Sequence, residues 1–299
     1  METVLQIKNL TKRYGRLTAV NKLNLEIQKG CVFGILGPNG SGKTTTLGIL
    51  LDVINKTEGD FSWFGQPATK EMRKRVGAIL ETPIFYPYLS AVKNLEIVAA
   101  IKGAPVANIE PVLKKVELYE RRFDKFRTYS LGMKQRLSIA SALLCDPEVM
   151  ILDEPTNGLD PQGIAEIRKL IKEIAADGKT IILASHLLDE VQKVCTHFCI
   201  LKKGNLIHVG GVEDVTKGAE LVEVRSESAD LNQVIAKFDG LSRLVEEESQ
   251  IVVTLKEGSN AGHLNKFLFE NGIVVTHLVT QRKSLEKQFL ELLAESDHA

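Results

Sequence analysis

Residues 37–44 of this chain read GPNGSGKT, and these eight residues say most about its fold. It fits the spacing G-x-x-x-x-G-K-T, follows a continuous apolar run at residues 31–36 (CVFGIL), and precedes a helical pattern that extends to about Leu51. Glycines let backbone N–H groups approach an anion without a Cβ in the way, and the following helix directs the positive end of its dipole at the same anion. The sequence therefore predicts a phosphate cradle between a buried strand and a helix.

A second apolar run ends in two carboxylates at residues 149–155, VMILDEP. Asp153 ends the predicted buried strand, where it can join the coordination shell of Mg²⁺. Glu154 follows at once and can orient or deprotonate an attacking water. In the cradle, Lys43 is expected to reach the β- and γ-phosphates of a nucleotide, and the Thr44 hydroxyl to bind the same Mg²⁺. The two stretches together predict nucleotide hydrolysis.

The composition narrows the class of protein. The chain has 299 residues, 44% of them hydrophobic, with 38 Lys plus Arg against 38 Asp plus Glu. A net charge of zero argues against binding to nucleic acid by bulk electrostatics, which needs a basic face. No apolar run approaches the roughly 20 residues that span a bilayer, and the first residues lack a signal-peptide pattern. We therefore expect a cytoplasmic protein with reduced thiols.

Strand and helix patterns alternate after residue 31, which predicts an α/β fold with a mainly parallel sheet. Residues 3–8 and 22–28 alternate as in a small antiparallel sheet, and residues 88–145 are mainly helical, with Ser90 and Ser130 as candidate N-caps. These segments make up a predicted first domain, residues 1–217.

A different pattern follows and predicts a C-terminal accessory domain, residues 218–299. Its order β-α-β-β-α-β suggests a small α+β, ferredoxin-like fold. A closing helix is predicted over residues 284–295 (SLEKQFLELLAE), where Leu285, Phe289, Leu290 and Leu293 form one apolar stripe.

The nonapeptide YSLGMKQRL, residues 129–137, resembles the signature motif of the ATP-binding cassette (ABC) family, LSGGQ and its variants. Ser130 and Gly132 match the serine and the second glycine of that motif, whereas Leu131 and Met133 depart from its commonest spelling. The motif opens a helix with a free hydroxyl and free amides, which suits it to gripping a γ-phosphate.

Other family motifs follow in order, and the resemblance covers about residues 3–215. It implies that Tyr14 stacks on adenine, that Gly158-Leu159-Asp160 is the D-loop, and that His186 is the switch histidine that contacts the γ-phosphate. The residues expected to contact the nucleotide are Tyr14, Gly37, Pro38, Asn39, Gly40, Ser41, Gly42, Lys43, Thr44, Thr45, Ser130, Gly132 and Asp160.

Glu81, in VGAILETP at residues 76–83, departs from the family pattern, because most members have a glutamine there. With FYPYLS following, it resembles the bacitracin- and lantibiotic-resistance branch of drug exporters. The resemblance implies a catalytic residue whose oxygen touches Mg²⁺ and the attacking water. The negative charge is tolerable because its neighbour is a divalent cation. The alternative is that Glu81 only caps the strand and hinges the helical subdomain.

The resemblance as a whole implies a P-loop ATPase of the ABC type that uses ATP and Mg²⁺. Two copies are expected to form a head-to-tail homodimer, each ATP lying between Gly37–Thr44 of one copy and Ser130–Gly132 of the other. The groove around Glu81 to Ser90 is expected to receive a cytoplasmic helix of a separately encoded membrane permease. The tail resembles those of export ATPases, which favours export as the direction of transport. The protein would then lie on the cytoplasmic face of the cell membrane, with no nucleic acid partner.

The alternative is a soluble ABC ATPase associated with the ribosome or with DNA. The ribosomal proteins that this chain resembles usually carry two cassettes in one chain, and this chain has one. Those of DNA repair insert a long coiled coil between cradle and signature, whereas here only 84 residues (45–128) separate Thr44 from Tyr129. Both comparisons favour the transporter.

Overall fold

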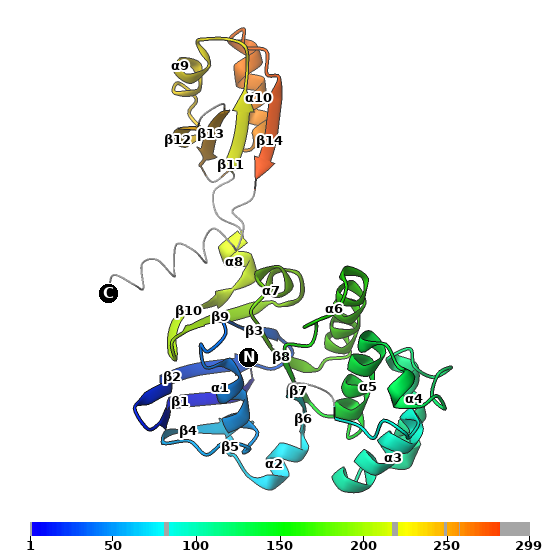
Figure 1. Ribbon diagram of the computed structural model, residues 1–299. Helices are drawn as coiled ribbons and strands as arrows, with labels where there is room; N and C mark the ends of the chain where they lie inside the picture. Colours follow the sequence, from blue (N-terminus) through cyan, green and yellow to red (C-terminus); the bar gives the residue numbers. More distant parts are fainter. Residues whose placement is uncertain (1, 81–83, 217–220, 248–249, 257, 282–299) are drawn as a thin grey trace. The chain divides into compact units, whose positions relative to one another are not determined.

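The computed structural model describes residues 2–80, 84–216, 221–247, 250–256 and 258–281. The chain divides into two compact units, Met1–Gly210 and Gly211–Ala299 (Figure 1). The domain boundary predicted at 217/218, the residue Glu81 and the tail helix predicted over 284–295 all lie outside the described residues.

An antiparallel sheet opens the first unit, as predicted. Its order is β2–β1–β4–β5, where the strands are β1 (Thr3–Tyr14), β2 (Leu17–Gln28), β4 (Glu58–Trp63) and β5 (Gln66–Pro67). The first two strands are longer than residues 3–8 and 22–28. Register shifts and the positive φ of Asn9 (51°) and Lys22 (45°) interrupt the alternation that marks a strand in the sequence.

The second sheet has the order β10–β9–β3–β8–β7–β6 and contains the site's strands. Its members are β3 (Val32–Leu36), β6 (Val76–Ile79), β7 (Val149–Asp153), β8 (Thr180–Ser185), β9 (His197–Lys202) and β10 (Asn205–Gly211). Strands β6, β7, β8, β3 and β9 pair in parallel, which confirms the mainly parallel sheet. The carboxyl ends of β3, β8 and β7 therefore meet at one edge, the usual place for a ligand in such a sheet.

Helices complete the first unit. They are α1 (Lys43–Leu50), α2 (Lys70–Lys74), α3 (Ala91–Lys102), α4 (Ile109–Lys115), α5 (Leu131–Leu143), α6 (Pro161–Ala176) and α7 (Leu188–Val194). Ser90 and Ser130 cap α3 and α5 as predicted, since their hydroxyls accept hydrogen bonds from Lys93 N at 3.3 Å and Met133 N at 3.2 Å. Figure 1 shows α3, α4 and α5 gathered on the side of this unit away from β1 and β2.

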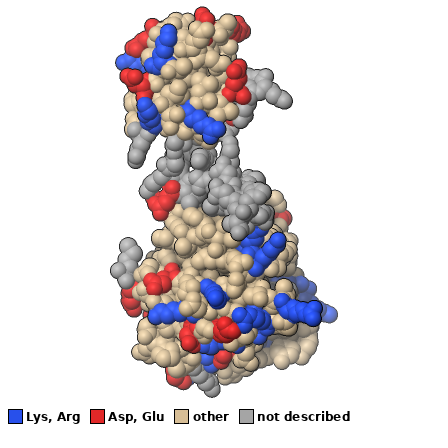
Figure 2. Space-filling model, turned by 90° about the vertical axis from the view of Figure 1, so that its left-hand side faces the viewer, with Lys and Arg blue, Asp and Glu red and all other residues tan. Residues whose placement is uncertain are grey.

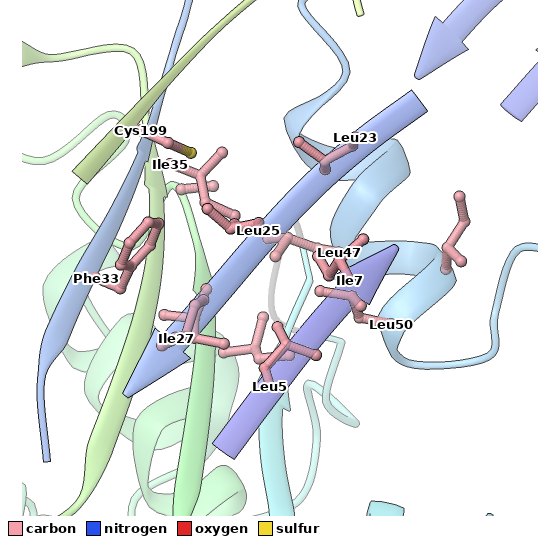
Figure 3. Packing of buried hydrophobic residues seen from close by; sticks show 14 of the residues in the cluster. Leu5, Ile7, Leu23, Leu25, Ile27, Phe33, Ile35, Leu47, Leu50 and Cys199 are labelled. Carbon is pink, nitrogen blue, oxygen red and sulfur yellow. The ribbon is translucent and has the colours of Figure 1, made fainter. Parts of the chain in front are cut away.

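Apolar side chains from both sheets and from α1 share one core, shown in Figure 3. Leu5 and Ile7 of β1 face Leu47 and Leu50 of α1, and Ile35 of β3 lies in the same cluster. All of these side chains are at most 2% exposed. Because α1 begins at Lys43, within the cradle, burying this helix between two sheets gives the cradle a rigid support.

The second unit contains a small antiparallel sheet of order β12–β13–β11–β14. Its elements are α8 (Val212–Thr216), β11 (Leu221–Arg225), α9 (Leu231–Ile235), β12 (Leu241–Glu247), β13 (Gln250–Leu255), α10 (Ala261–Glu270) and β14 (His277–Gln281). The sheet and its two helices, α9 and α10, bury an apolar cluster of their own, which includes Val222, Val253 and Leu264.

Acidic and basic side chains are mixed on the face of each unit seen in Figure 2. Within the described residues, no helix combines the length and the apolar character that crossing a membrane requires.

Candidate nucleotide-binding site

The loop between β3 and α1 has a shape that only glycine permits at two positions. Gly42 has φ +105°, and a Cβ there would lie 2.4 Å from the carbonyl oxygen of Ala19. A Cβ on Gly37 would lie 2.3 Å from the carbonyl oxygen of Leu201. The chain can therefore fold tightly around an anion here only because both side chains are absent.

Polar groups of this loop point inward. The Lys43 side chain is 5% exposed, and its Nζ donates to the carbonyl oxygens of Gly37 at 2.8 Å and Pro38 at 3.3 Å. Among the described residues, the buried Ser41 Oγ has no hydrogen-bond partner. A buried ammonium, a free hydroxyl and a helix N-terminus at one place form a donor set that fits a polyphosphate.

Thr44 and Asp153 meet at the carboxyl edge of the parallel sheet. Thr44 Oγ1 donates to Asp153 Oδ2 at 2.8 Å, and Asp153 is 2% exposed at the end of β7. Hard oxygen donors of this kind suit Mg²⁺. No cluster of three or more His, Cys, Asp or Glu side chains within the described residues could hold a metal unaided.

Glu154 lies between a cation and an imidazole. Its Oε1 is 3.6 Å from Lys43 Nζ, and its Oε2 is 2.8 Å from Nδ1 of His186. Its backbone N–H donates to the carbonyl oxygen of Ala184 at 2.9 Å, which extends the β7–β8 pairing by one residue. The sequence placed Glu154 and His186 32 residues apart, and the parallel sheet brings them into hydrogen-bond contact.

A cavity of about 280 Å³ opens beside the loop. It is lined by Tyr14, Leu17, Ala19, Asn39, Gly40, Gly42, Lys43, Thr44, Thr45 and Glu154. Tyr14 is 46% exposed on its wall, as a side chain that stacks on a base would be. Leu17 and Ala19 are lining residues that the sequence reasoning missed, because small apolar residues after a turn carry no chemical signal.

Six of the expected nucleotide contacts do not line this cavity. Gly37, Pro38 and Ser41 belong to the adjoining loop, whereas Ser130, Gly132 and Asp160 belong to other segments. Ser130 caps α5, and the space within 4 Å of a Cβ built on Gly132 is open. Asp160 caps α6, where its Oδ1 accepts from Gly163 N at 2.8 Å. The segment that precedes α5 is anchored by its neighbours. The Tyr129 hydroxyl, for example, donates to Arg121 O at 2.7 Å, and burial raises the pKa of Tyr129 to about 12.

Comparison with known proteins gives one family. Residues 20–157 match the family model described as ABC transporter. The chain is 41% identical to an uncharacterized ABC transporter ATP-binding protein, YhcH, of Bacillus subtilis, with 99% of this chain and 98% of that protein covered. It is 39% identical to the bacitracin transport ATP-binding protein BcrA of Bacillus licheniformis, covering 98% of both chains. It is also 40% identical to the lantibiotic transport ATP-binding protein SrtF of Streptococcus pyogenes, covering 68% and 89%.

Solved structures give the same fold. CbiO1 of Clostridium perfringens, part of an ABC transporter complex, aligns with a TM-score of 0.67 at 26% identity over 80% of this chain and 96% of its own. The ATP-binding cassette MJ0796, solved as a dimer bound to ADP and Pi, aligns with a TM-score of 0.61 at 28% identity over 70% and 98%. By family model, by full-length similarity and by fold, the chain belongs to the ABC transporter family, as an ATP-binding subunit and an ATPase.

Proposed function

We propose that this chain hydrolyses ATP to drive a separately encoded membrane permease, in an exporter of the bacitracin and lantibiotic kind. The position of Glu154 is the main support for ATP hydrolysis. Its carboxylate oxygens lie 3.6 Å from Lys43 Nζ and 2.8 Å from His186 Nδ1. Relatives named for bacitracin transport support the exporter, because the similarity to BcrA extends through the second unit as well as the cassette. The protein would then lie on the cytoplasmic face of the membrane.

The polar groups in and beside the cavity have distinct roles in this mechanism. The backbone N–H groups of residues 37–44 and Lys43 bind the phosphates and balance the charge that develops on the γ-phosphoryl oxygens. Glu154 accepts the proton of the attacking water, and His186 orients the Glu154 carboxylate. Magnesium, when bound with ATP, would take Thr44 and Asp153 as protein ligands and neutralise phosphate charge. Tyr14 stacks on the base.

A second copy of the chain completes the site in this proposal. Ser130 and Gly132 do not line the cavity of their own chain, although a helix N-terminus with open space before it suits a γ-phosphate. The structure of MJ0796, a dimer bound to ADP and Pi, supports a pair of copies, and we propose that the pair is head-to-tail. Asp160, at the start of α6, would then also belong to the dimer interface.

Glu81 is proposed as a further oxygen ligand of the metal. The described strand β6 that precedes it pairs in parallel with β7, with Ile79 opposite Leu152. The segment after β6 therefore starts at the same edge of the sheet as Asp153, which supports the metal role over a purely local cap.

The permease is proposed to insert a cytoplasmic helix beside this segment. A cavity of about 370 Å³ there is lined mainly by apolar side chains, among them Ile79, Leu80, Phe85 and Val98. At its rim, Ile84 is 94% exposed and Ile101 is 79% exposed. Exposed apolar side chains around an apolar groove are typical of a protein interface.

The second unit is proposed to have a ferredoxin-like fold. The element order β-α-β-β-α-β and the sheet order β12–β13–β11–β14 support it. It would regulate the dimer or its partner, since no nucleotide-binding motif lies in residues 218–299.

The substitution Glu154→Gln tests the hydrolytic proposal. It should keep ATP binding, lower the hydrolysis rate by roughly 10²–10⁴-fold and accumulate an ATP-bound dimer in light scattering. The exposed Glu173 on α6 provides the matched control, since Glu173→Gln should leave the rate unchanged. A Glu154→Gln protein that hydrolyses ATP at the wild-type rate would show that Glu154 is not the base.

A further inference from the structure

Glu190 of α7 is a buried carboxylate that the mechanism above does not use. It is 1% exposed, and no Lys, Arg or His among the described residues forms an ion pair with it. Its two oxygens each accept a hydroxyl hydrogen bond: Oε1 from Thr156 Oγ1, and Oε2 from Ser185 Oγ at 2.9 Å. Removing a carboxylate from water is costly unless its hydrogen bonds are made, so a Glu at this depth needs a reason to be present.

The two hydroxyl partners come from the two loops that carry the proposed catalytic pair. Thr156 is two residues after Glu154, and Ser185 directly precedes His186. Ser185 Oγ in turn accepts from the backbone N–H of Leu187 at 3.0 Å, so the Ser185 hydroxyl holds the chain on both sides of His186. Thr156 is 3% exposed and Ser185 is fully buried.

Backbone pairing cannot align these loops unaided. The β7–β8 ladder ends at the pair Asp153 and Ala184, and among the described residues only the hydrogen bond from Glu154 N–H to Ala184 O extends it. Beyond that point the loops meet through the Glu154–His186 contact, whose side chains are 20% and 35% exposed, and through Glu190. Of these two links, the one made by Glu190 is fully buried and is screened from solvent.

We propose that Glu190 is a positioning residue for ATP hydrolysis, which holds the Glu154 loop and the His186 loop at the separation that the reaction needs. This inference rests on the proposed roles of Glu154 and His186. A carboxylate is required because it only accepts hydrogen bonds, and both partners donate. An amide would present an N–H to one of the two hydroxyls. That hydroxyl would then accept instead of donate, and its own hydrogen would lose its buried acceptor.

The test begins with Glu190→Gln, measured by steady-state ATPase kinetics and by the affinity for a fluorescent ATP analogue. We expect kcat to fall about 10–100-fold, as when supporting hydrogen bonds of functional ligands are removed, with KM and nucleotide affinity within about threefold of wild type. The neighbouring Asp189→Asn, whose carboxylate is 59% exposed, is the control and should keep kcat.

The double variant Thr156→Val/Ser185→Ala removes the same two links while keeping Glu190. It should lose as much kcat as Glu190→Gln, and adding Glu190→Gln to it should lower kcat by less than about threefold, because coupled residues are not additive. If Glu190→Gln fails to fold, the kcat of the double variant tests the inference in its place.

A folded Glu190→Gln with kcat within about twofold of wild type would overturn the inference, as would a loss confined to nucleotide affinity. Glu154→Gln separates the two proposals. If it abolishes hydrolysis while Glu190→Gln does not, only the role of Glu190 fails. If it hydrolyses ATP normally, the proposed function itself fails.

Discussion

At the scale of single residues, Glu154 holds an unusual backbone conformation. Its φ is +47°, in the left-handed region that costs a non-glycine residue about 1 kcal/mol or more. Strain of this kind persists where the surroundings over-determine it, and here the N–H to Ala184 and the contacts to Lys43 and His186 do so. The backbone conformation turns the carboxylate into the cavity.

The strained backbone of Glu154 predicts a difference in stability between two variants at this position. Glu154→Gly should be more stable than Glu154→Ala by about 1 kcal/mol, because glycine adopts a positive φ without penalty. Thermal unfolding of the two variants measures the difference, and neither should hydrolyse ATP. At Glu173, inside helix α6, the order should reverse, with glycine less stable than alanine by about 1 kcal/mol. Equal stability of the two Glu154 variants would mean that the backbone is unstrained.

Glu81 is tested through its dependence on magnesium. Glu81→Gln keeps an oxygen and should lower hydrolysis by less than about tenfold, whereas Glu81→Ala should lose about 10–100-fold. Because Gln lacks the charge, its Mg²⁺ requirement should rise, and added Mg²⁺ should restore much of the rate. A Mg²⁺ titration of the ATPase rate for wild type and both variants checks this, and three superimposable curves would leave Glu81 as a structural cap.

The candidate site residues could be identified from the sequence where they belong to a motif with a fixed spacing. The cradle, Asp153 and Glu154 all follow buried strands, and the parallel sheet then brings them together. The role of Glu190 could not be predicted, because a glutamate in LLDEVQKV is typical of the solvent-exposed face of a helix. Its burial depends on Thr156 and Ser185, which belong to two other segments.

At the scale of elements, Arg136 links three helical segments. Its guanidinium, 10% exposed, donates to Val116 O at 3.0 Å and Glu117 Oε2 at 2.9 Å near the end of α4, and to Glu166 Oε2 of α6 at 3.0 Å. The helix that begins with Ser130 is therefore held to the helix that begins after Asp160. Both ends of the proposed dimer surface depend on this link.

The Arg136 link predicts a pH dependence. The hydrogen bond from Arg136 lowers the pKa of Glu166 from its usual 4.5, so its stabilisation is present above pH 4.5 and is lost as the pH falls through the lowered pKa. Arg136→Met should destabilise the protein at pH 7 by about 1–2 kcal/mol, chiefly by leaving Val116 O unsatisfied. Thermal unfolding of Glu166→Gln should show a deficit at pH 7 that shrinks below pH 4.5. A deficit that is constant with pH would exclude the ionic contribution.

Ser130 tests the proposed dimer. Ser130→Arg adds bulk and charge where the partner's nucleotide would lie, so ATP should still bind through Lys43 and Tyr14 while ATP-driven dimers disappear in light scattering. Ser90→Arg is the matched control, since it removes the same kind of helix cap from α3 and should leave the dimers intact. Dimers that persist in Ser130→Arg would mean that α5 does not face the partner.

Elements with strong local signals were predictable, and the others were not. Ser90 and Ser130 cap their helices, and Pro161 at the first position of α6 (Pro161–Ala176) is a local signal for the start of a helix. The five-residue helix α2 was missed because so short a segment shows no periodicity. The first helix expected in the order β-α-β-β-α-β is also short, Leu231–Ile235 (α9), since the turn to β12 uses the residues that follow it.

At the scale of the whole molecule, the two units differ in what they contribute. Every residue that lines the nucleotide cavity lies between Tyr14 and Glu154, and the second unit has its own apolar cluster around Val222, Val253 and Leu264. Separate cores imply that each unit can fold on its own. The composition shift near Ala219 could reveal the second unit from the sequence. Its effect on the cassette could not be predicted, because coupling between units has no local signature.

Deleting residues 219–299 tests this division. The truncated chain keeps the core around Leu5, Leu47 and Ile35, so its Mg-ATP affinity should stay within about threefold of the full chain, a change under about 0.7 kcal/mol. The stability of the ATP-bound dimer, or its regulation by the permease, should change instead. Isothermal titration gives the affinity, light scattering with ATP gives the dimer, and circular dichroism confirms that the truncation is folded. A folded truncation that no longer binds ATP would show that the second unit supports the nucleotide site directly, through contacts that the first unit cannot replace.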